Sequence, residues 1–215
     1  VASVALQSGR PPRTYTVDVG DRFSEMPYAR MVADRYRTDH HEIAIEPEDV
    51  HRIAPTVMWH LEEPLSVSEI PTFYLGQAVG RHVKVLLCGE GSDELFGGYK
   101  RFLPLNAAPW LPRRVVGWGY VRGLNGLTRT DRLALSSTAQ RPFTGPDTNV
   151  HLEGALDRSG ALLDRLLRYE LVHQLRSQVL RLDKLTMAHG VEARCPFLDS
   201  ELVAYAAKLP ARLKV

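Results

Sequence analysis

Three carboxylates stand close together in the stretch LLCGEGSDELFGGY, residues 86–99: Glu90, Asp93 and Glu94. The stretch begins as an apolar run and turns abruptly into glycines and acids. A strand that runs into Gly-Glu-Gly lets backbone groups approach a ligand closely, because glycine has no side chain in the way. At such a strand end, Glu90 could accept a proton or hold a cationic amine. The spacing alone leaves both a functional and a structural role open for Glu90.

The other two acids have a structural explanation. The segment SDELFGGY predicts a short helix with Ser92 as its N-cap, which would place Asp93 and Glu94 in the first turn. Negative side chains stabilise this end of a helix, where unpaired backbone N–H groups give a partial positive charge. Glu90 precedes the predicted cap and gains nothing from this effect.

A second group of charged residues lies in RLDKLTMAHGVEARCPFLDSELVAY, residues 181–205. Asp183, Glu192, Arg194 and Asp199 stand at predicted helix boundaries, where ion pairs commonly fix one helix against another. The spacing of this group alone does not identify an active site.

The elements that must position these groups alternate between short strands and helices. An apolar run without polar interruption, such as residues 83–88, is typical of a strand buried on both faces in a parallel sheet. We therefore predict an α/β fold, a parallel sheet with helices on both faces, and ligands beyond the carboxyl ends of its strands, near residues 88–91. Strands are expected at 13–19, 40–47 and 83–88, and helices at 24–37, 47–61 and 68–82, the second with a break or kink at Pro55.

The rest of the chain is expected to be mainly helical. Residues 1–9 resemble the end of a helix, and leucines at three- and four-residue spacings predict a helix from 161 onward. Asp199 is a suitable cap for a last helix. We expect a single domain over 1–215, with a nucleotide-binding α/β part at 1–100, an irregular or helical insertion at 101–160, and a helical part at 161–215.

Composition excludes several classes of protein. With 27 basic and 25 acidic residues the net charge is +2, so the charge balance does not favour nucleic acid or an anionic membrane as partner. No apolar segment approaches the roughly 20 residues that span a bilayer, and no signal peptide is recognisable. Cys88 and Cys195 are far apart in sequence, which favours two thiols in a reducing cytoplasm. Neither has a second ligand at metal-binding spacing, and Asp-His-His at 39–41 is interpreted as the polar start of a strand.

Taken together, the two charged stretches are far more specific than either alone. LLCGEGSDELFGGY followed by LDKLTMAHGVEARCPFLD resembles the synthetase domain of glutamine-dependent asparagine synthetases. The resemblance extends upstream through TYTVDV and MWHLEEPLSVSEIPTFYLGQAVGRH and weakens at 101–160. It implies the fold of the PP-loop ATP pyrophosphatases, in agreement with the α/β prediction.

The resemblance implies a two-step reaction. A carboxylate, expected to be that of aspartate, attacks the α-phosphate of ATP and gives an acyl-adenylate and pyrophosphate. Ammonia from a glutaminase domain then displaces AMP and forms an amide. The pyrophosphate calls for backbone amides, basic residues and Mg²⁺. The ammonia step calls for a base, because attack on the activated carbonyl leaves a protonated amine.

Matched positions imply roles for single residues. Val17 resembles the strand residue whose backbone meets adenine. Cys88 and Gly89 resemble the nucleotide-binding pair at the strand end, where the family often has Ser in place of Cys88, and we group Gly91 with them. Glu90 resembles the residue that binds ammonia and carries its proton.

The remaining matches concern the substrate side of the site. Asp93 resembles an acid that faces the substrate. Arg181, Asp183, Glu192 and Arg194 would lie close by, either touching the substrate or supporting residues that do. No metal ligand is predicted within these 215 residues.

Some expected parts are not in the sequence. The family's Ser-Gly-Gly-x-Asp-Ser loop would precede Val1, a pyrophosphate-stabilising lysine would follow Val215, and the glutaminase domain is missing. We therefore expect the chain to be truncated at both ends and inactive alone, and a homodimer is left open. The alternatives are a β-lactam synthetase-like or lasso-peptide cyclase-like enzyme, of which Glu90 disfavours the first, or a non-catalytic nucleotide-binding remnant.

Overall fold

The computed structural model divides into two compact units, which are described separately. The first unit comprises Val1–Gly89 and Ser177–Pro196, and the second comprises Glu90–Arg176 and Phe197–Val215. The structure describes residues 9–20, 24–65, 68–103, 112, 115–116, 119–120, 133–135, 137–138, 150–156 and 159–214.

The first unit contains a parallel pair of strands, β1 (Arg13–Asp18) and β2 (Asp39–Ala44). Helix α2 (Met26–Tyr36) lies between them in sequence, as a parallel pair requires, since a tight hairpin cannot join two strands that run in the same direction. The helix ends where Arg37 adopts a left-handed conformation, with φ of 49°. The backbone N–H of Arg37 donates to the carbonyl oxygens of Ala33 and Asp34 in the last turn of the helix, and the chain then turns back into β2.

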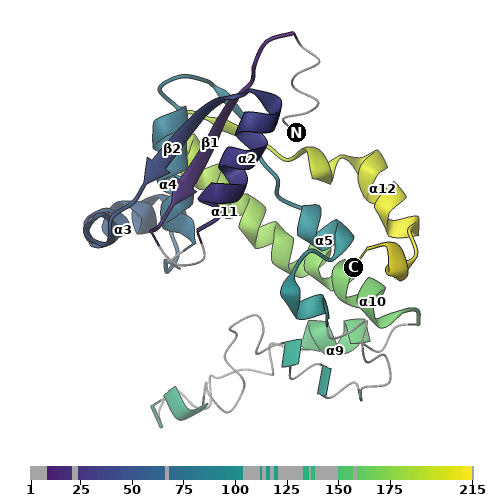
Figure 1. The fold of residues 1–215 in the computed structure, drawn as a ribbon. Helices are drawn as coiled ribbons and strands as arrows, with labels where there is room; N and C mark the ends of the chain where they lie inside the picture. Colours follow the sequence, from purple (N-terminus) through teal and green to yellow (C-terminus); the bar gives the residue numbers. More distant parts are fainter. Residues whose placement is uncertain are drawn as a thin grey trace. The chain divides into compact units, whose positions relative to one another are not determined.

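Helices cover both faces of this sheet (Figure 1). Alternate side chains of a strand point to opposite faces. Glu42 points to the face covered by α2, where Arg30 donates to its carboxylate from Nε at 2.5 Å and from Nη2 at 2.7 Å. His41 points to the other face and stacks on His82, just beyond helix α4 (Glu69–Val79), with ring centroids 6.0 Å apart. The predicted α/β class, with a parallel sheet covered on both faces, is confirmed.

Helix α3 (Pro47–Leu61) precedes α4 and packs against it. It begins at Pro47, as predicted, and the Glu46 and Asp49 side chains form a reciprocal cap. Of the predicted break or kink at Pro55 the break is wrong, because the helix continues through Pro55 to Leu61, and the kink stays a prediction. An apolar cluster joins α3, α4 and helix α11 (Leu175–Met187), and consists of Val57, Leu61, Phe73 and Leu185.

A second parallel pair in the first unit is β3 (Val85–Leu87) with β4 (Glu192–Arg194). The prediction that β3 is buried is wrong for two of its residues: Val85 is 42% exposed and Leu87 48% exposed. Both side chains point to the same face of the strand, and no described part of the chain covers that face enough to bury them.

The second unit is helical in its described residues. Its elements are α5 (Ser92–Phe96), a 3-10 turn at Lys100–Phe102, α9 (Val150–Leu156), α10 (Leu162–Tyr169), a π-helical turn at Glu170–Gln174, α12 (Ser200–Lys208) and a 3-10 turn at Ala211–Leu213. A further 3-10 turn, Pro196–Leu198, begins in the first unit. The core of the second unit consists of Phe102, Val116, Tyr120, Leu152, Leu156, Leu163, Leu166, Leu167 and Tyr169.

Most predicted elements are present within a few residues of their predicted bounds. Asp199 caps α12 as expected, accepting hydrogen bonds from the backbone N–H groups of Glu201 and Leu202 at 3.0 and 3.2 Å. The predicted helix end at 1–9 lies outside the described residues except at Gly9, and much of 101–160 lies outside them too. The division at 100 and 160 stays a prediction. None of the described helices is both long and apolar enough to cross a bilayer.

Two glycines give a matched test of packing in the fold. A Cβ at Gly80, the C-cap of α4, would lie 2.8 Å from the backbone oxygen of His189, whereas one at Gly154 in α9 meets nothing within 4 Å in the described structure. Gly80→Ala should therefore destabilise the protein by about 1–3 kcal/mol, because backbone must shift. Gly154→Ala should stabilise it by about 0.5–1 kcal/mol through helix propensity.

The measurement is the urea-unfolding midpoint of each variant of the full-length protein. Equal midpoints for Gly80→Ala and Gly154→Ala would show that the close approach of α4 to His189 is wrong.

Candidate active site

Cys88 follows β3 directly and lies beside the end of β4. The Cys88 N–H donates to the backbone oxygen of Arg194 at 2.8 Å, which continues the β3–β4 ladder by one step. Both strands run in the same direction, so their carboxyl ends lie at one edge of the sheet. The structure thus brings the predicted nucleotide-binding end of β3 next to Glu192–Arg194, although about a hundred residues separate them in sequence.

Gly89 and Gly91 have different structural roles. Gly91 has φ of 94°, a conformation that side chains rarely tolerate, and a Cβ there would overlap the Leu198 side chain. At Gly89 a Cβ would meet no described atom within 4 Å. The fold therefore explains why residue 91 is glycine, whereas nothing in the described structure fills the space at Gly89, where a ligand could approach the backbone.

Glu90 is partly buried and its proton is held more tightly than usual. Burial, followed by the negative charges of Glu94 and Asp93, raises the pKa of Glu90 above its ordinary value. A carboxyl group with a raised pKa lies closer to the range in which an acid or base can exchange protons near neutral pH. This property suits the proton-handling role that the sequence predicts.

Asp93 lies in the first turn of α5, as predicted, and the following turn packs against it. Its backbone oxygen accepts hydrogen bonds from the N–H groups of Gly97 and Gly98, at 2.8 and 3.2 Å. A Cβ at Gly98 would overlap the Asp93 carboxylate oxygen Oδ1 and lie 3.0 Å from Cγ. Gly98 thus leaves the space that the carboxylate occupies, a function that sequence reasoning missed.

The predicted cap of α5 is wrong. Gly91, not Ser92, is the N-cap residue, and no side chain caps this end. The positive φ of Gly91 turns the chain into the helix without a side-chain acceptor, so Ser92 becomes the first helical residue. Glu94 lies in the first turn as predicted but is only 1% exposed, and the Tyr99 hydroxyl donates to it at 2.6 Å.

Of the supporting residues, Arg181 is held by two carboxylates. Its Nε lies 2.7 Å from Glu63 and its Nη1 lies 3.2 Å from Glu69, which is 5% exposed. The neighbouring Lys184 donates to the backbone oxygen of Leu61 at 2.7 Å. These two cations of α11 fix the connection between α3 and α4, so the contacts of Arg181 favour a supporting role.

The other predicted residues are placed as follows. Asp183 is exposed on α11, and Arg194 donates to Glu192 on the exposed side of β4 at 2.9 Å. Val17 lies on β1 opposite Ile43. Glu90 and Asp93 belong to the second unit, and the remaining predicted residues, except Gly91, belong to the first.

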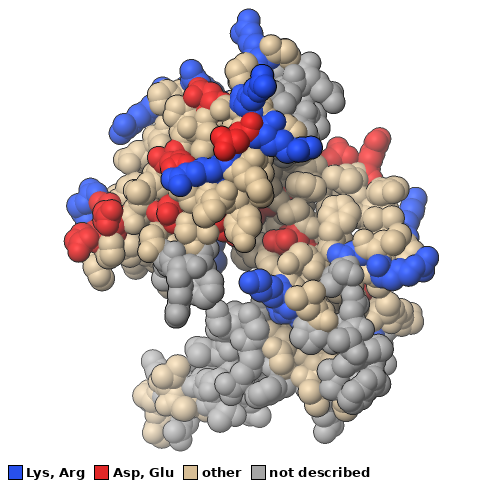
Figure 2. Space-filling model, viewed as in Figure 1, with Lys and Arg blue, Asp and Glu red and all other residues tan. Residues whose placement is uncertain are grey.

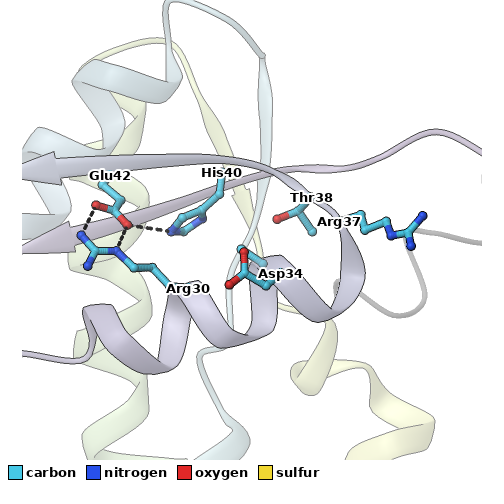
Figure 3. A pocket seen from close by; sticks show the side chains of 7 residues that line it. Arg30, Asp34, Arg37, Thr38, His40 and Glu42 are labelled. Carbon is cyan, nitrogen blue, oxygen red and sulfur yellow. Dashed lines mark hydrogen bonds and ion pairs between the residues drawn. The ribbon is translucent and has the colours of Figure 1, made fainter.

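A pocket in the first unit lies between α2 and β2 (Figure 3). It contains none of the predicted site residues. Arg30 and His40 both point toward Glu42, with His40 Nε2 at 3.9 Å from the carboxylate, and the Arg30 guanidinium forms an ion pair with that carboxylate. We therefore assign this pocket no role in catalysis.

Neither metal nor nucleic acid binding gains support from the described residues. They contain no group of three or more His, Cys, Asp or Glu side chains that could hold a metal ion. On the face shown in Figure 2, side chains of both charges are interspersed over the described residues. The predicted lack of a nucleic acid partner stays a prediction.

The fold and the loop define a mixed α/β protein that carries a carboxylate of raised pKa just beyond a parallel strand. The family model for asparagine synthase matches residues 1–215, so the chain belongs to the asparagine synthase family. The predicted resemblance is thereby confirmed.

Curated relatives agree with this family. A putative glutamine-hydrolysing asparagine synthetase of Mycobacterium bovis is 31% identical over the whole chain, which spans 38% of that relative. Asparagine synthetase [glutamine-hydrolyzing] 1 of Bacillus subtilis is 27% identical, again over the whole chain and 39% of the relative. Amidase chry2 of Gibberella zeae is 26% identical over 94% of the chain and 38% of its own length. The chain therefore spans well under half the length of these relatives.

The packing of Gly98 on Asp93 gives a test of that carboxylate. Gly98→Ala should displace the Asp93 side chain and weaken substrate binding about tenfold or more, equivalent to about 1.4 kcal/mol, while the protein stays folded. Gly119→Ala is the matched control, because a Cβ there meets nothing within 4 Å in the described structure.

The measurement is the KM of the full-length protein for aspartate, the carboxylate that the resemblance implies as substrate, with circular dichroism to verify folding. An unchanged KM in folded Gly98→Ala protein would exclude a substrate contact by Asp93.

Proposed function

We propose that the protein containing this chain is an ATP-dependent amide-forming ligase. It activates a carboxylate, that of aspartate, as an acyl-adenylate and then amidates it with ammonia derived from glutamine. The products are asparagine, AMP and pyrophosphate. The observation that carries the proposal is Glu90, a partly buried carboxyl of raised pKa in the glycine loop of a chain that belongs to the asparagine synthase family.

The first step needs a nucleotide site at the carboxyl ends of the strands. We assign the backbone of Val17 to adenine, and Cys88, Gly89 and Gly91 to the nucleotide at the end of β3. Support comes from the open space at Gly89 and from the Cys88 N–H, which donates to the backbone of Arg194, so that a side chain other than Ser at this position leaves the strand pairing intact. The side chains of the described residues do not form a Mg²⁺ site.

The second step needs a group that takes a proton. Ammonia adds to the acyl carbon of the adenylate, AMP leaves with the electron pair of the broken bond, and the new nitrogen carries one proton too many. We assign acceptance of this proton to the Glu90 carboxylate. Its raised pKa increases its affinity for that proton, while the open space at Gly89 leaves room for the adduct.

The partners follow from the same proposal. The two synthetases compared above are named as glutamine-hydrolysing, which favours a glutaminase domain as the source of ammonia. Amidase chry2 bears a different name at similar identity, so the carboxylate substrate has to be tested directly. A cytoplasmic location and a homodimer are further expectations.

The first test supplies the full-length protein with ATP, Mg²⁺, aspartate and ammonia. We expect AMP and pyrophosphate in equal amounts, with asparagine as product, and the measurement is their release over time by chromatography. If aspartate yields no AMP while another carboxylate does, the asparagine assignment fails and a related amide synthetase takes its place. A protein that releases no AMP with any carboxylate would be a non-catalytic nucleotide-binding relative.

The second test separates the two steps. Glu90→Gln should lower amide formation about 100-fold or more, because the proton acceptor is lost, while exchange of labelled pyrophosphate into ATP continues. The control is Glu201→Gln, which makes the same change at an exposed carboxylate in the first turn of α12.

If Glu90→Gln lowers amide formation and pyrophosphate exchange equally, Glu90 is needed for adenylation or for folding and not specifically for the ammonia step. Amide formation at the wild-type rate would remove Glu90 from the mechanism.

A further inference from the structure

The two cysteines of the chain, Cys88 and Cys195, lie more than a hundred residues apart in sequence but at the same end of one pair of strands. Cys88 directly follows β3, and Cys195 directly follows β4. The last paired residues of this ladder are Leu87 and Arg194, so the two cysteines are the next pair in register. Both are half-buried thiols. The fold therefore brings together two residues that the sequence keeps apart.

Hydrogen bonds at both ends of the ladder fix this register. The Glu192 N–H donates to the backbone oxygen of Lys84 at 2.8 Å, and the Cys88 N–H donates to the backbone oxygen of Arg194 at 2.8 Å. The second bond ends on the peptide group that joins Arg194 to Cys195, so it holds the backbones of the two cysteines side by side. Neighbouring strands lie about 4.8 Å apart, which is within the range of about 4.4–6.8 Å that separates Cα atoms across a disulfide.

The two cysteine side chains also project to the same face of the strand pair. Successive side chains of a strand alternate between faces, and residues in register on parallel strands share a face. Burial along β3 and β4 follows this alternation. The exposed positions are Val85, Leu87, Glu192 and Arg194, and the half-buried positions are Leu86, Cys88, Ala193 and Cys195. The Cβ atoms of both cysteines therefore point to the half-buried face.

Pro196 ends the ladder at this pair of residues. The next bond of a parallel ladder would run from the N–H of residue 196 to the backbone oxygen of Cys88, and proline has no N–H. The chain leaves the strand pair here on both sides, into Gly89 and into the 3-10 turn Pro196–Leu198. The cysteine backbones can therefore approach each other more easily than residues in the middle of a sheet.

We propose that Cys88 and Cys195 form a modification site, a pair of thiols that closes to an intramolecular disulfide and opens again on reduction. The oxidant is a low-molecular-weight disulfide. One cysteine thiolate attacks a sulfur of this oxidant and expels one thiolate, and the second cysteine thiolate then attacks the protein sulfur of the mixed disulfide and expels the other. The two protein sulfurs lose two electrons, which leave with the expelled thiolates, and these take up the two protons that the cysteines release.

The disulfide would act on the loop that follows Cys88. This effect alone rests on the proposed function, in which Cys88 and Gly89 meet the nucleotide. Facing Cβ atoms on parallel strands are about as far apart as the strands, whereas a disulfide holds them about 3.8 Å apart, so closure draws the strand ends together by about 1 Å. Gly89 follows directly, where the space beside the backbone is open in the described structure. The disulfide form should therefore bind ATP more weakly than the dithiol form.

The test incubates the native full-length protein with reduced and oxidised glutathione at a series of ratios. Remaining thiols are then alkylated, and the protein is digested with trypsin. Mass spectrometry should find residues 85–100, which contain Cys88, linked to residues 195–208, which contain Cys195. The linked protein should run as a monomer on a non-reducing denaturing gel, and dithiothreitol should remove the link.

Cys195→Ser is the matched control, since it changes one sulfur to oxygen. It should give no link at any glutathione ratio. Without oxidant it should exchange labelled pyrophosphate into ATP at the wild-type rate, because Cys195 has no assigned role at the nucleotide. In the wild type, the KM for ATP in this exchange should rise about tenfold or more in the linked form and return to its first value with dithiothreitol.

The outcomes separate this inference from the proposed function. The inference is overturned if the cysteines stay thiols or take up glutathione singly without forming the link, or if the link joins two copies of the protein. Linked protein with an unchanged KM for ATP overturns the effect on the nucleotide site. A reduced wild-type protein that releases no AMP overturns the proposed function, while the peptide analysis still decides whether Cys88 and Cys195 pair.

Discussion

The parallel pairing of β3 with β4 is the contact on which the candidate site depends. Three residue pairs and the further bond from Cys88 to Arg194 align two segments from distant parts of the sequence, so that both end at one edge. Every later feature of the loop starts from that edge: the open backbone at Gly89, then Glu90, then the turn into α5. Helix α11 precedes β4, and its residues Arg181 and Lys184 bind the connection between α3 and α4. These contacts hold α11 in place and therefore also position the start of β4.

Beyond that edge, the short helix α5 derives its geometry from backbone rather than from side-chain caps. Gly91 starts it in a left-handed conformation, and Gly97, with φ of 75°, ends it. This leaves the carboxylates free for other contacts: Asp93 lies against Gly98, and Glu94 is buried against Tyr99. The ion pair of Arg101 with Glu170 connects the segment after α5 to the π-helical turn that follows α10.

Much of this arrangement could be predicted from the sequence. Strand and helix patterns predicted most of the elements. Gly-Glu-Gly after an apolar run predicted the position of Glu90 beyond a strand end, and its catalytic role stays a proposal. The cap of α5 was predicted incorrectly, because Ser92 has the right residue type but Gly91 has the conformation that starts the helix. The burial of Val85 and Leu87 was also overestimated, since an apolar strand is buried only where another element covers it. The contacts of Tyr99 with Glu94 and of Gly98 with Asp93 each span five residues, and that of Arg101 with Glu170 spans 69. No hydrophobic or capping pattern in the sequence indicates any of the three.

Glycines meet the conformational demands of the loop, and the catalytic role that we propose belongs to Glu90, which lies between two of them. Substituting Gly91 would strain the backbone, and substituting Gly98 would displace a carboxylate, but neither restricts the kind of side chain at position 90. A substitution at position 90 meets neither of these two constraints, so the loop can keep its backbone path while the chemical group that it presents changes.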